Sequence, residues 1–329
     1  MKKLFTATLL LTLFVSLSCF ATDIKIALIA PEGSTWTKVV REWDKELREK
    51  SQGRVGFKIY AGGVQGDEKD VIRKMRISQI HAAGFTGLGL GMINPSVRIL
   101  ELPMLFNNYN EVDAVRTIIK GELEKGFSEK GFQVLGWSET GFVNILSNKP
   151  ISSREDMNGM KMWMWEGDPL VKAMYDRFDI VPIPLSIANV LTSLQTNLLD
   201  AVYTPPLGAI ALQWFTRTKY MTDLNLANST GAIVVSNKMF NSLSPQDKNL
   251  LLTTGKKYGT ELRNRIRVEN EESKKLLQKN GIKMVSVPDA QVKIISDRSR
   301  LVWDDLVGKL YPEALLTKVK TTLAGMRGK

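Results

Sequence analysis

Apolar and polar positions alternate along the chain with two different periods, and the period changes at regular intervals. Residues 23–30 have the two-residue period of a strand and are rich in Ile, whereas residues 36–50 carry apolar positions at helical spacing. The pattern predicts further strands at 54–60, 80–85, 132–137 and 142–147, and further helices at 67–77 and 112–130. Strands that alternate with helices are typical of a parallel α/β sheet covered on both faces.

The same alternation starts again near residue 160 and predicts a second α/β unit. Its strands are predicted at 160–165, 180–183 and 201–203, and its helices at 169–178 and 186–197. Two such units fit two lobes with a cleft between them, and ligand pockets commonly form at such junctions.

A single long helix is predicted at 244–280. Ser244 is a suitable N-cap with Asp247 three residues later, and an Asn-Gly pair at the far end is a stop signal. A continuous helix of this length would extend about 50 Å, which is enough to span both lobes. Gly255 and Gly259 are the positions where it would break or kink. Acidic side chains interleave its basic ones, which is typical of a solvated surface rather than of a nucleic-acid site.

The first 21 residues have the anatomy of a secretory signal peptide. Lys2 and Lys3 precede an apolar stretch, and the segment ends in a small-x-small pattern, Cys19-Phe20-Ala21. The apolar stretch is shorter than the roughly 18 to 20 residues that a membrane span needs. Cys19 is the only cysteine, so cleavage after Ala21 leaves no thiol for a disulfide or for catalysis. The alternative is a lipoprotein in which Cys19 is acylated.

Composition excludes several classes of protein. The chain has 329 residues, 43% of them hydrophobic and 24% charged, which is ordinary for a globular protein of about two domains. Its net charge of +11 is moderate, and we expect no nucleic-acid partner. With one histidine, His81, the chain lacks the ligands of an HExxH zinc site and has almost no room for a catalytic triad. We therefore expect no enzyme activity, no metal and no cofactor.

A run of glycines, Gly87-Leu88-Gly89-Leu90-Gly91, is the nearest approach to a cofactor motif. Its spacing is G-x-G-x-G rather than the dinucleotide-binding G-x-G-x-x-G, and Asn94-Pro95 follows instead of a capped helix. The run predicts a flexible loop.

The strand predicted at 160–165 is the most informative one. Its three methionines share one face, whereas Lys161, Trp163 and Trp165 share the other. Paired tryptophans are usually core residues. Lys161 on the same face indicates instead that this face opens toward solvent or a cleft, and the sequence alone leaves both interpretations open.

Four segments together resemble the solute-binding proteins of tripartite ATP-independent periplasmic (TRAP) transporters, of the dicarboxylate-binding type. Residues 62–66 (GGVQG) resemble the family's turn after the second strand, and residues 102–106 (LPMLF) its LPxLF segment. Residues 150–161 (PISSREDMNGMK) resemble its PIxsxeDlkGlK run, and residues 193–200 (SLQTNLLD) its ALQtgxvD run. Each motif is loose, but their order and spacing together are specific.

The resemblance implies a two-lobed periplasmic-binding-protein fold of the α/β class, with a ligand cleft between the lobes and the long helix spanning both. Lobe I would comprise residues 22–140 and 230–270, and lobe II residues 141–229 and 271–329. It also implies a periplasmic receptor that closes around one small-molecule solute and delivers it to the integral membrane subunits of a TRAP transporter. Such a receptor has no chemistry and no cofactor of its own.

This sequence departs from the family's pattern where the family binds its solute. The arginine that holds the solute's carboxylate is matched by Trp163, and a second arginine of some members by Val143. Asn189 stands at the family's glutamate, and Thr204 at the asparagine of its DgxeNP segment. A guanidinium donates paired hydrogen bonds to a carboxylate, and an unpaired ion is strongly disfavoured in a dry cleft. A simple dicarboxylate or sugar acid is therefore not the expected solute.

We expect instead a mostly apolar or aromatic solute, with lipid-like chemistry as one form of it, fixed by a few polar contacts. The predicted ligand-binding residues are Trp163, Val143, Asn189, Tyr203, Thr204, Phe85, Thr86, Phe142, Ile187, Asp67, Trp36 and Trp214, with Trp137 and Trp165 nearby. A cation held over Trp163, with Asp67 and Glu166 as acids, is a second hypothesis. In a third, Lys161 or Arg177 holds a carboxylate from a different direction.

Two other functions compete with the receptor. One is a periplasmic carrier on the same fold that shuttles a lipid or another hydrophobic molecule between membranes, which would need a cleft too long for one small solute. The other is a periplasmic enzyme, which the missing triad and metal ligands disfavour. His81 is interpreted as a structural residue at the end of a strand.

Overall fold

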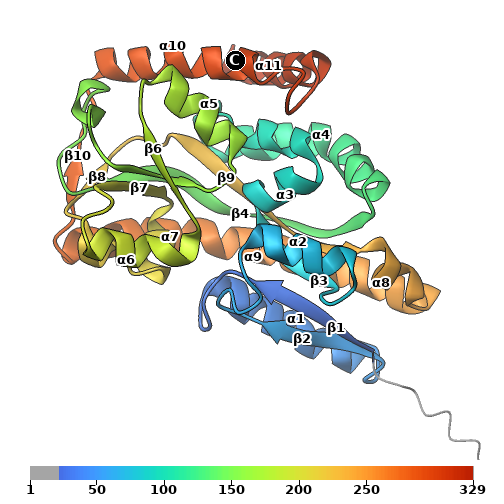
Figure 1. Ribbon diagram of the computed structural model, residues 1–329. Coiled ribbons are helices and arrows are strands. Elements are labelled where there is room, and N and C mark those ends of the chain that lie inside the picture. The colour runs from blue at the N-terminus through green and yellow to red at the C-terminus, as the bar shows by residue number, and fades with distance from the viewer. Residues whose placement is uncertain (1–21, 329) are drawn as a thin grey trace, which may run out of the picture.

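The computed structural model describes residues 22–328, so the predicted signal peptide with Cys19 lies outside the described residues. Within that range ten strands form one hydrogen-bonded network of two sheets (Figure 1). The two sheets share the long strand β4 (Phe132–Ser147), which pairs with β9 in the first and with β7 in the second. The α/β class and the presence of two units are as predicted.

The first sheet has the strand order β2-β1-β3-β9-β4. Its other strands are β1 (Thr22–Leu28), β2 (Val55–Tyr60), β3 (Ala82–Thr86) and β9 (Ala227–Ser236), and its helices include α1 (Thr35–Lys50), α2 (Glu68–Arg76) and α4 (Tyr109–Glu129). β1 lies parallel to β2 and β3, but β9 is antiparallel to both β3 and β4. The prediction of an all-parallel sheet was wrong, because a strand from the second half of the chain returns between β3 and β4.

The second sheet continues from β4 through β7, β5 and β6, with β8 and β10 beside it. These strands are β5 (Met162–Trp165), β6 (Pro182–Leu185), β7 (Ala201–Thr204), β8 (Tyr220–Thr222) and β10 (Lys283–Val285). The surrounding helices are α5 (Pro169–Arg177), α6 (Val190–Gln195), α7 (Pro206–Ala211), α10 (Asp289–Asp305) and α11 (Glu313–Arg327), with short 3-10 turns at Ile187–Asn189 and Trp214–Arg217. β5 is parallel to both neighbours, as its buried, apolar sequence favours.

The long helix α9 (Pro245–Lys279) is continuous and packs on β4, on α1 and on α7, so it contacts both sheets (Figure 1). Ser244 caps it by accepting a hydrogen bond from the Asp247 backbone. Its two glycines do not break it, contrary to one alternative of the sequence prediction. A Cβ at Gly255 would lie 2.6 Å from the Leu135 carbonyl oxygen, so these glycines allow the helix to approach β4 closely.

Two local predictions were also wrong. The strands predicted at 132–137 and 142–147 are one continuous strand, β4. Its pairing with β9 shifts register between Glu139 and Gly141, and Gly141 has a φ of +113°. The glycine run is a helix, α3 (Gly87–Ile93), capped by the Thr86 hydroxyl, rather than a flexible loop.

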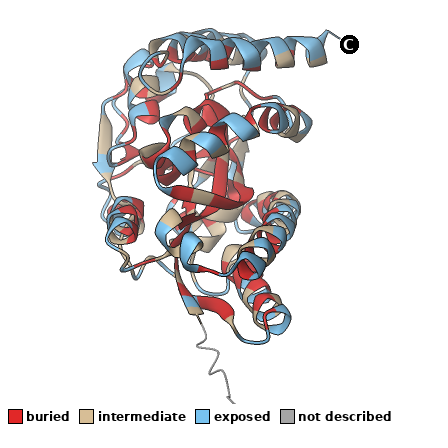
Figure 2. Cartoon of the chain, turned by 90° about the vertical axis from the view of Figure 1, so that its right-hand side faces the viewer, coloured by how far each residue is buried: buried red, intermediate tan, exposed pale blue. Residues whose placement is uncertain are grey.

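Buried residues gather on the central strands and the inward helix faces (Figure 2). Among residues 22–328, no helix has the length and apolar character that crossing a membrane requires.

Candidate solute-binding site

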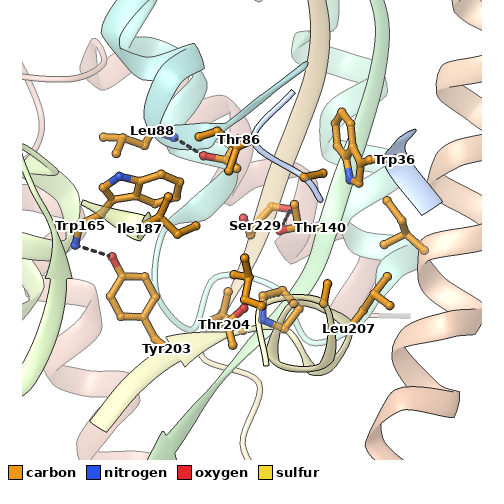
Figure 3. Close-up of a pocket in the computed structure, with 18 of the residues that line it drawn as sticks. Trp36, Thr86, Leu88, Thr140, Trp165, Ile187, Tyr203, Thr204, Leu207 and Ser229 are labelled. Atoms are coloured by element: carbon orange, nitrogen blue, oxygen red, sulfur yellow. Dashed lines mark hydrogen bonds between the residues drawn. The ribbon is translucent and has the colours of Figure 1, made fainter. Parts of the chain in front are cut away.

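A cavity of about 580 Å³ lies between elements of the two sheets (Figure 3). One side is formed by residues that follow β1 and by β3, and the other by β5, β7 and α7. Nine of the twelve predicted ligand-binding residues line it: Trp36, Phe85, Thr86, Val143, Trp163, Ile187, Tyr203, Thr204 and Trp214. Trp165, which was expected nearby, lines it too.

The other three predicted residues lie elsewhere. Phe142 packs against the Tyr109 ring at 4.7 Å in the core, because neighbouring residues of a strand face opposite sides and Val143 faces the cavity. Asn189 is exposed and donates a hydrogen bond to Ser186 Oγ at 3.1 Å. Asp67 caps α2 and accepts hydrogen bonds from Trp165.

Aromatic side chains form the wall that β5 contributes. Trp163 is almost fully buried and donates its Nε1 hydrogen to the Leu185 carbonyl at 3.0 Å. It stacks on Tyr203 at 4.7 Å and meets Trp214 edge-on at 5.2 Å. The methionines of β5 pack into a different cluster from the tryptophans, so the predicted alternation is confirmed. The tryptophans are therefore both core residues and cavity wall.

A buried ion cluster in the cavity wall was missed by the sequence analysis. Arg98, in the 3-10 helix Pro95–Glu101, donates Nη2 hydrogens to the Asp168 carboxylate at 3.0 and 2.9 Å. Its Nε lies 3.1 Å from Glu101 Oε2, and all three side chains are buried. Burial lowers the Arg98 pKa, but the two carboxylates outweigh burial and raise it above its ordinary value.

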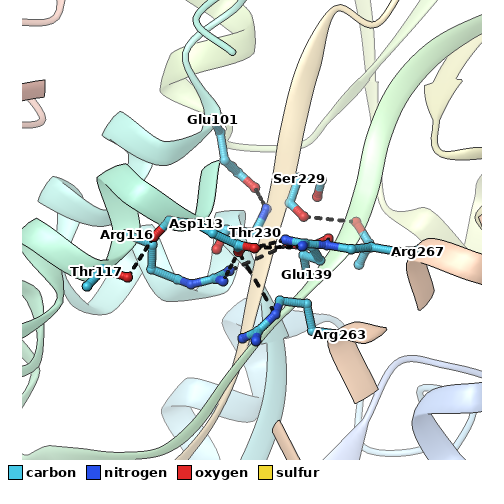
Figure 4. Close-up of polar contacts among 10 residues, drawn as sticks. Glu101, Asp113, Arg116, Thr117, Glu139, Ser229, Thr230, Arg263 and Arg267 are labelled. Carbon is cyan, nitrogen blue, oxygen red and sulfur yellow. Dashed lines mark hydrogen bonds and ion pairs between the residues drawn. The ribbon is translucent and has the colours of Figure 1, made fainter. Parts of the chain in front are cut away.

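The two carboxylates of this cluster are held by backbone groups. Burial raises the pKa of Glu101 to about 6, although the Arg98 charge acts the other way. Glu101 also accepts a hydrogen bond from the Thr230 backbone at 2.8 Å (Figure 4). Asp168 caps α5 by accepting hydrogen bonds from the two backbone N–H groups at Leu170 and Val171. In the sequence, the Asp-Pro pair at 168–169 indicates a helix N-terminus. Arg98 lies in an apolar run, and the sequence does not indicate which acids it pairs with.

Glu68 is a third buried carboxylate in the cavity wall. It accepts hydrogen bonds from the Thr86 backbone and hydroxyl and from the Gly89 backbone, at 2.6 to 3.0 Å. Burial raises its pKa to about 8, although these hydrogen bonds act to lower it. A Cβ at Gly87 would overlap the Glu101 carboxyl, and one at Gly89 would lie 2.7 Å from Glu68 Oε2. The glycine run therefore allows α3 to pack against two carboxylates.

The charged residues proposed for the alternative ligands do not line the cavity. Lys161 Nζ donates to the Asn197 carbonyl at 3.0 Å, and Arg177 pairs with Asp305. Glu166 forms an ion pair with Lys69 at 2.7 Å. The second and third ligand hypotheses thus lose the residues on which they were based. No group of three or more potential metal-ligating side chains occurs in the part of the chain that the structure describes.

Three closely spaced side chains on the β5 side of the cavity contact residues beside the first sheet, although Glu166, Lys69 and Asp67 do not line the cavity themselves. Trp165 Nε1 donates to Asp67 at 3.2 and 3.0 Å, Glu166 pairs with Lys69, and Asp168 pairs with Arg98. We call these three pairs the cross-cavity contacts. They join the loop between β5 and α5 to elements beside the first sheet.

Solved structures of similar fold are TRAP periplasmic solute-binding proteins. One from Pseudomonas putida F1, with bound D-glucuronate, is 24% identical with a TM-score of 0.83, covering 90% of this chain and 96% of its own. Another from Sulfurospirillum deleyianum, with bound succinate, is 18% identical with a TM-score of 0.85, covering 91% and 98%. The two-lobed fold expected from the sequence is thereby confirmed.

Sequence comparison gives the same family. The chain is 23% identical over 272 residues to the 2,3-diketo-L-gulonate-binding periplasmic protein of Escherichia coli K12, covering 82% of this chain and 79% of that one. It is 22% identical over 300 residues to the sialic acid-binding periplasmic protein of Vibrio cholerae, covering 88% and 90%. Residues 26–309 match the model of the bacterial extracellular solute-binding proteins, family 7. The chain therefore belongs to this family, whose members are periplasmic solute receptors of TRAP transporters and not enzymes.

Proposed function

We propose that this receptor traps one mostly apolar or aromatic solute and presents it to the integral membrane subunits of a TRAP transporter. The observation that supports the apolar solute is the aromatic wall of the cavity. Trp36, Trp163, Trp165 and Trp214 all line it, together with Tyr203 and Phe85. Aromatic and aliphatic walls with a few polar groups suit ligands that bury apolar surface.

The charges in the wall also favour a solute without a carboxylate. The acidic residues that line the cavity are Glu32, Glu68, Glu101, Asp168 and Glu269, and the basic ones are Lys38 and Arg98. Arg98 is already paired with two of these acids. The raised pKa of Glu68, about 8, favours its neutral form at pH 7, but the other four acids still outnumber the two bases. A bound carboxylate would therefore meet more like charge than opposite charge, which is costly in a dry site.

Cavity size supports a receptor over a long-range lipid carrier. A volume of about 580 Å³ is within the ordinary range for a single small-molecule ligand. The carrier hypothesis required a cleft too long for one small solute, and a volume of this size supports a single small ligand instead. The receptor is therefore the function we carry forward.

Trapping would use the cross-cavity contacts. With the lobe boundaries predicted from the sequence, Trp165, Glu166 and Asp168 belong to lobe II and their partners to lobe I. Only differential affinity for the closed arrangement shifts the equilibrium toward closure. A solute that contacts the Trp165 indole and the first lobe at once supplies such affinity.

Native mass spectrometry of protein purified from the periplasm without refolding tests the solute class. A retained apolar or aromatic molecule, identified by fragmentation, is the expected result, and the same protein after unfolding and refolding is the control that should lack it. A retained sugar acid or dicarboxylate, the class bound by the solved relatives, would overturn the apolar proposal. The intact mass also distinguishes two forms of processing. We propose cleavage after Ala21, and the alternative is a protein acylated at Cys19.

A further inference from the structure

One carboxylate that lines the cavity has no cationic partner in the protein. Ile266 and Glu269, one turn apart on α9, both line the cavity. Glu269 is half-buried, and its carboxylate accepts a hydrogen bond from the hydroxyl of Thr35, the first residue of α1. No ion pair to Glu269 occurs among residues 22–328. The cavity therefore has in its wall a negative charge that the described chain leaves unpaired.

The surroundings of Glu269 hold it in place without neutralising it. The Thr35 hydroxyl donates one hydrogen bond, and the N-terminal end of α1 favours a neighbouring negative charge. Neither group supplies a full positive charge. Lys38, one turn further along α1, is exposed and forms no ion pair with Glu269, so solvent screens its charge.

The ion pairs elsewhere in the wall do not reverse this balance. Arg98 faces both Glu101 and Asp168, so this buried cluster keeps one net negative charge. Glu32 pairs with Arg41 and adds no net charge. A cation that enters the cavity meets an excess of negative charge, and the apolar walls strengthen the attraction by lowering the local dielectric constant.

Aromatic surface begins next to the hydrogen-bond partner of Glu269. Trp36 follows Thr35 and lines the cavity. Its indole packs over β3 and β9, where a Cβ at Gly84 or Gly231 would lie 2.9 Å from a ring atom. Figure 3 shows Trp36 on the opposite side of the cavity from Trp165. A solute that starts near Trp36 and extends toward Trp165 thus has aromatic surface at both ends.

We propose that Glu269 recognises a protonated amine, so that the solute is a cation with an aromatic or aliphatic body. The ammonium group donates charge-assisted hydrogen bonds to the Glu269 carboxylate, and the body lies against the tryptophans. This site differs from the cation over Trp163 considered in the sequence analysis, because its acid comes from α9. The assignment rests on the proposed function and adds the charge and the head group of the solute.

Four probes with the same apolar body test the head group: 4-phenylbutylamine, 4-phenylbutan-1-ol, 4-phenylbutanoate and butylbenzene. Binding to the refolded protein is followed by tryptophan fluorescence near neutral pH, where an alkylamine is protonated. We expect the amine to bind at least about tenfold more tightly than the alcohol, and the carboxylate to bind more weakly than either. The whole chain has a positive net charge, so a preference for the amine is no general ion-exchange effect. This comparison needs no variant, so it stands even if a substitution prevents folding.

Glu269→Gln then tests the residue itself, because glutamine keeps the size of the side chain and still accepts from Thr35. We expect an affinity loss of about tenfold for the amine and no change for the alcohol or for butylbenzene. Glu271→Gln is the matched control, since it removes the same charge from an exposed position of α9 that does not line the cavity. It should change none of these affinities.

The outcomes separate this inference from the proposed function. Equal or tighter binding of the carboxylate, or an amine affinity that Glu269→Gln leaves unchanged or that Glu271→Gln lowers equally, overturns the amine site. Binding of butylbenzene and the alcohol with no preference for the amine overturns it while leaving the apolar solute class intact. Failure of all four probes to bind overturns the apolar solute class and this inference together.

Discussion

In the proposed function, Trp165 is the residue that takes part in both solute binding and closure. Its indole lines the cavity, and its Nε1 donates to the Asp67 carboxylate on the other side. Trp165→Phe keeps an aromatic ring in the wall but removes the donor. We expect this change to shift the protein from the closed toward the open arrangement, because the hydrogen bond exists only when the two sides meet.

The magnitude follows from the chemistry of this contact. A hydrogen bond to a charged group contributes about 1.5–3 kcal/mol. Trp165 is buried but Asp67 is half-buried, so the lower end of that range applies. A loss of about 1.5 kcal/mol corresponds to roughly a tenfold fall in the ratio of closed to open protein. Solute affinity should weaken by a similar factor where closure is required for binding.

Electron–electron distance measurements between two spin labels report the populations directly. Val64 and Val181 are exposed, the first before α2 and the second before β6, and each accepts a labelled cysteine without disturbing the core. Cys19, in the predicted signal peptide, is the only native cysteine, so labelling of the processed protein would be specific. We expect Trp165→Phe to raise the fraction of the longer distance.

A double-mutant cycle with Asp67→Ala separates the hydrogen bond from lost packing and from the α2 cap. Lys69→Ala is the matched control, because Lys69 and Glu166 are both about half exposed and such pairs contribute little. Identical distance distributions for the wild type and Trp165→Phe, with and without solute, would refute the closure role of this contact.

Three further predictions concern two residues singled out in the sequence, Trp163 and His81, and one found in the structure, Glu68. Trp163→Arg places a guanidinium among the Tyr203 and Trp214 rings in a buried position, so the melting temperature and the affinity for the native solute should both fall. Unchanged solute affinity would remove Trp163 from the site. His81→Gln should leave binding nearly unchanged in a titration, because His81 Nδ1 accepts from the Lys25 backbone and does not line the cavity; a large loss would contradict this. The pKa of Glu68 is raised from 4.5 to about 8, so the folded state binds this proton more tightly than the unfolded chain, and stability should fall as pH rises through that interval. Glu68→Gln should flatten this part of the melting curve against pH, and an unchanged slope would show that Glu68 is ionised throughout.

Periodicity predicted most individual elements because each strand or helix shows its buried face locally. The long helix, its Ser244 cap and the alternate faces of β5 all followed from nearest neighbours in the sequence. The antiparallel insertion of β9 did not, because pairing between residues far apart leaves no local pattern. The glycine run was misinterpreted for the same reason: its glycines are explained by Glu68, Glu101 and Arg98, which approach it in space.

The cavity wall was predicted in part through the family resemblance, which placed Trp163, Val143, Tyr203 and Thr204 on matching positions. All four line the cavity. Arg98 and Asn228 were missed because an isolated polar residue in an apolar segment is indistinguishable from one that is exposed. The pairing of Arg98 with Glu101 and Asp168, and the lack of a hydrogen-bond partner at Asn228 Oδ1 among the described residues, are visible only once the surrounding atoms are placed.

The insertion of β9 between β3 and β4 also fixes the order in which the chain is able to fold. Until Ala227–Ser236 has been made, β3 has β1 as its one sheet neighbour in the described chain, and its other edge stays open. An open apolar edge is a template for pairing with other chains. A chain truncated before residue 227 should therefore aggregate, and the first sheet can be completed only after about two thirds of the polypeptide has been synthesised. This late completion delays folding of the first sheet during synthesis, which would suit the export across a membrane that the predicted signal peptide implies.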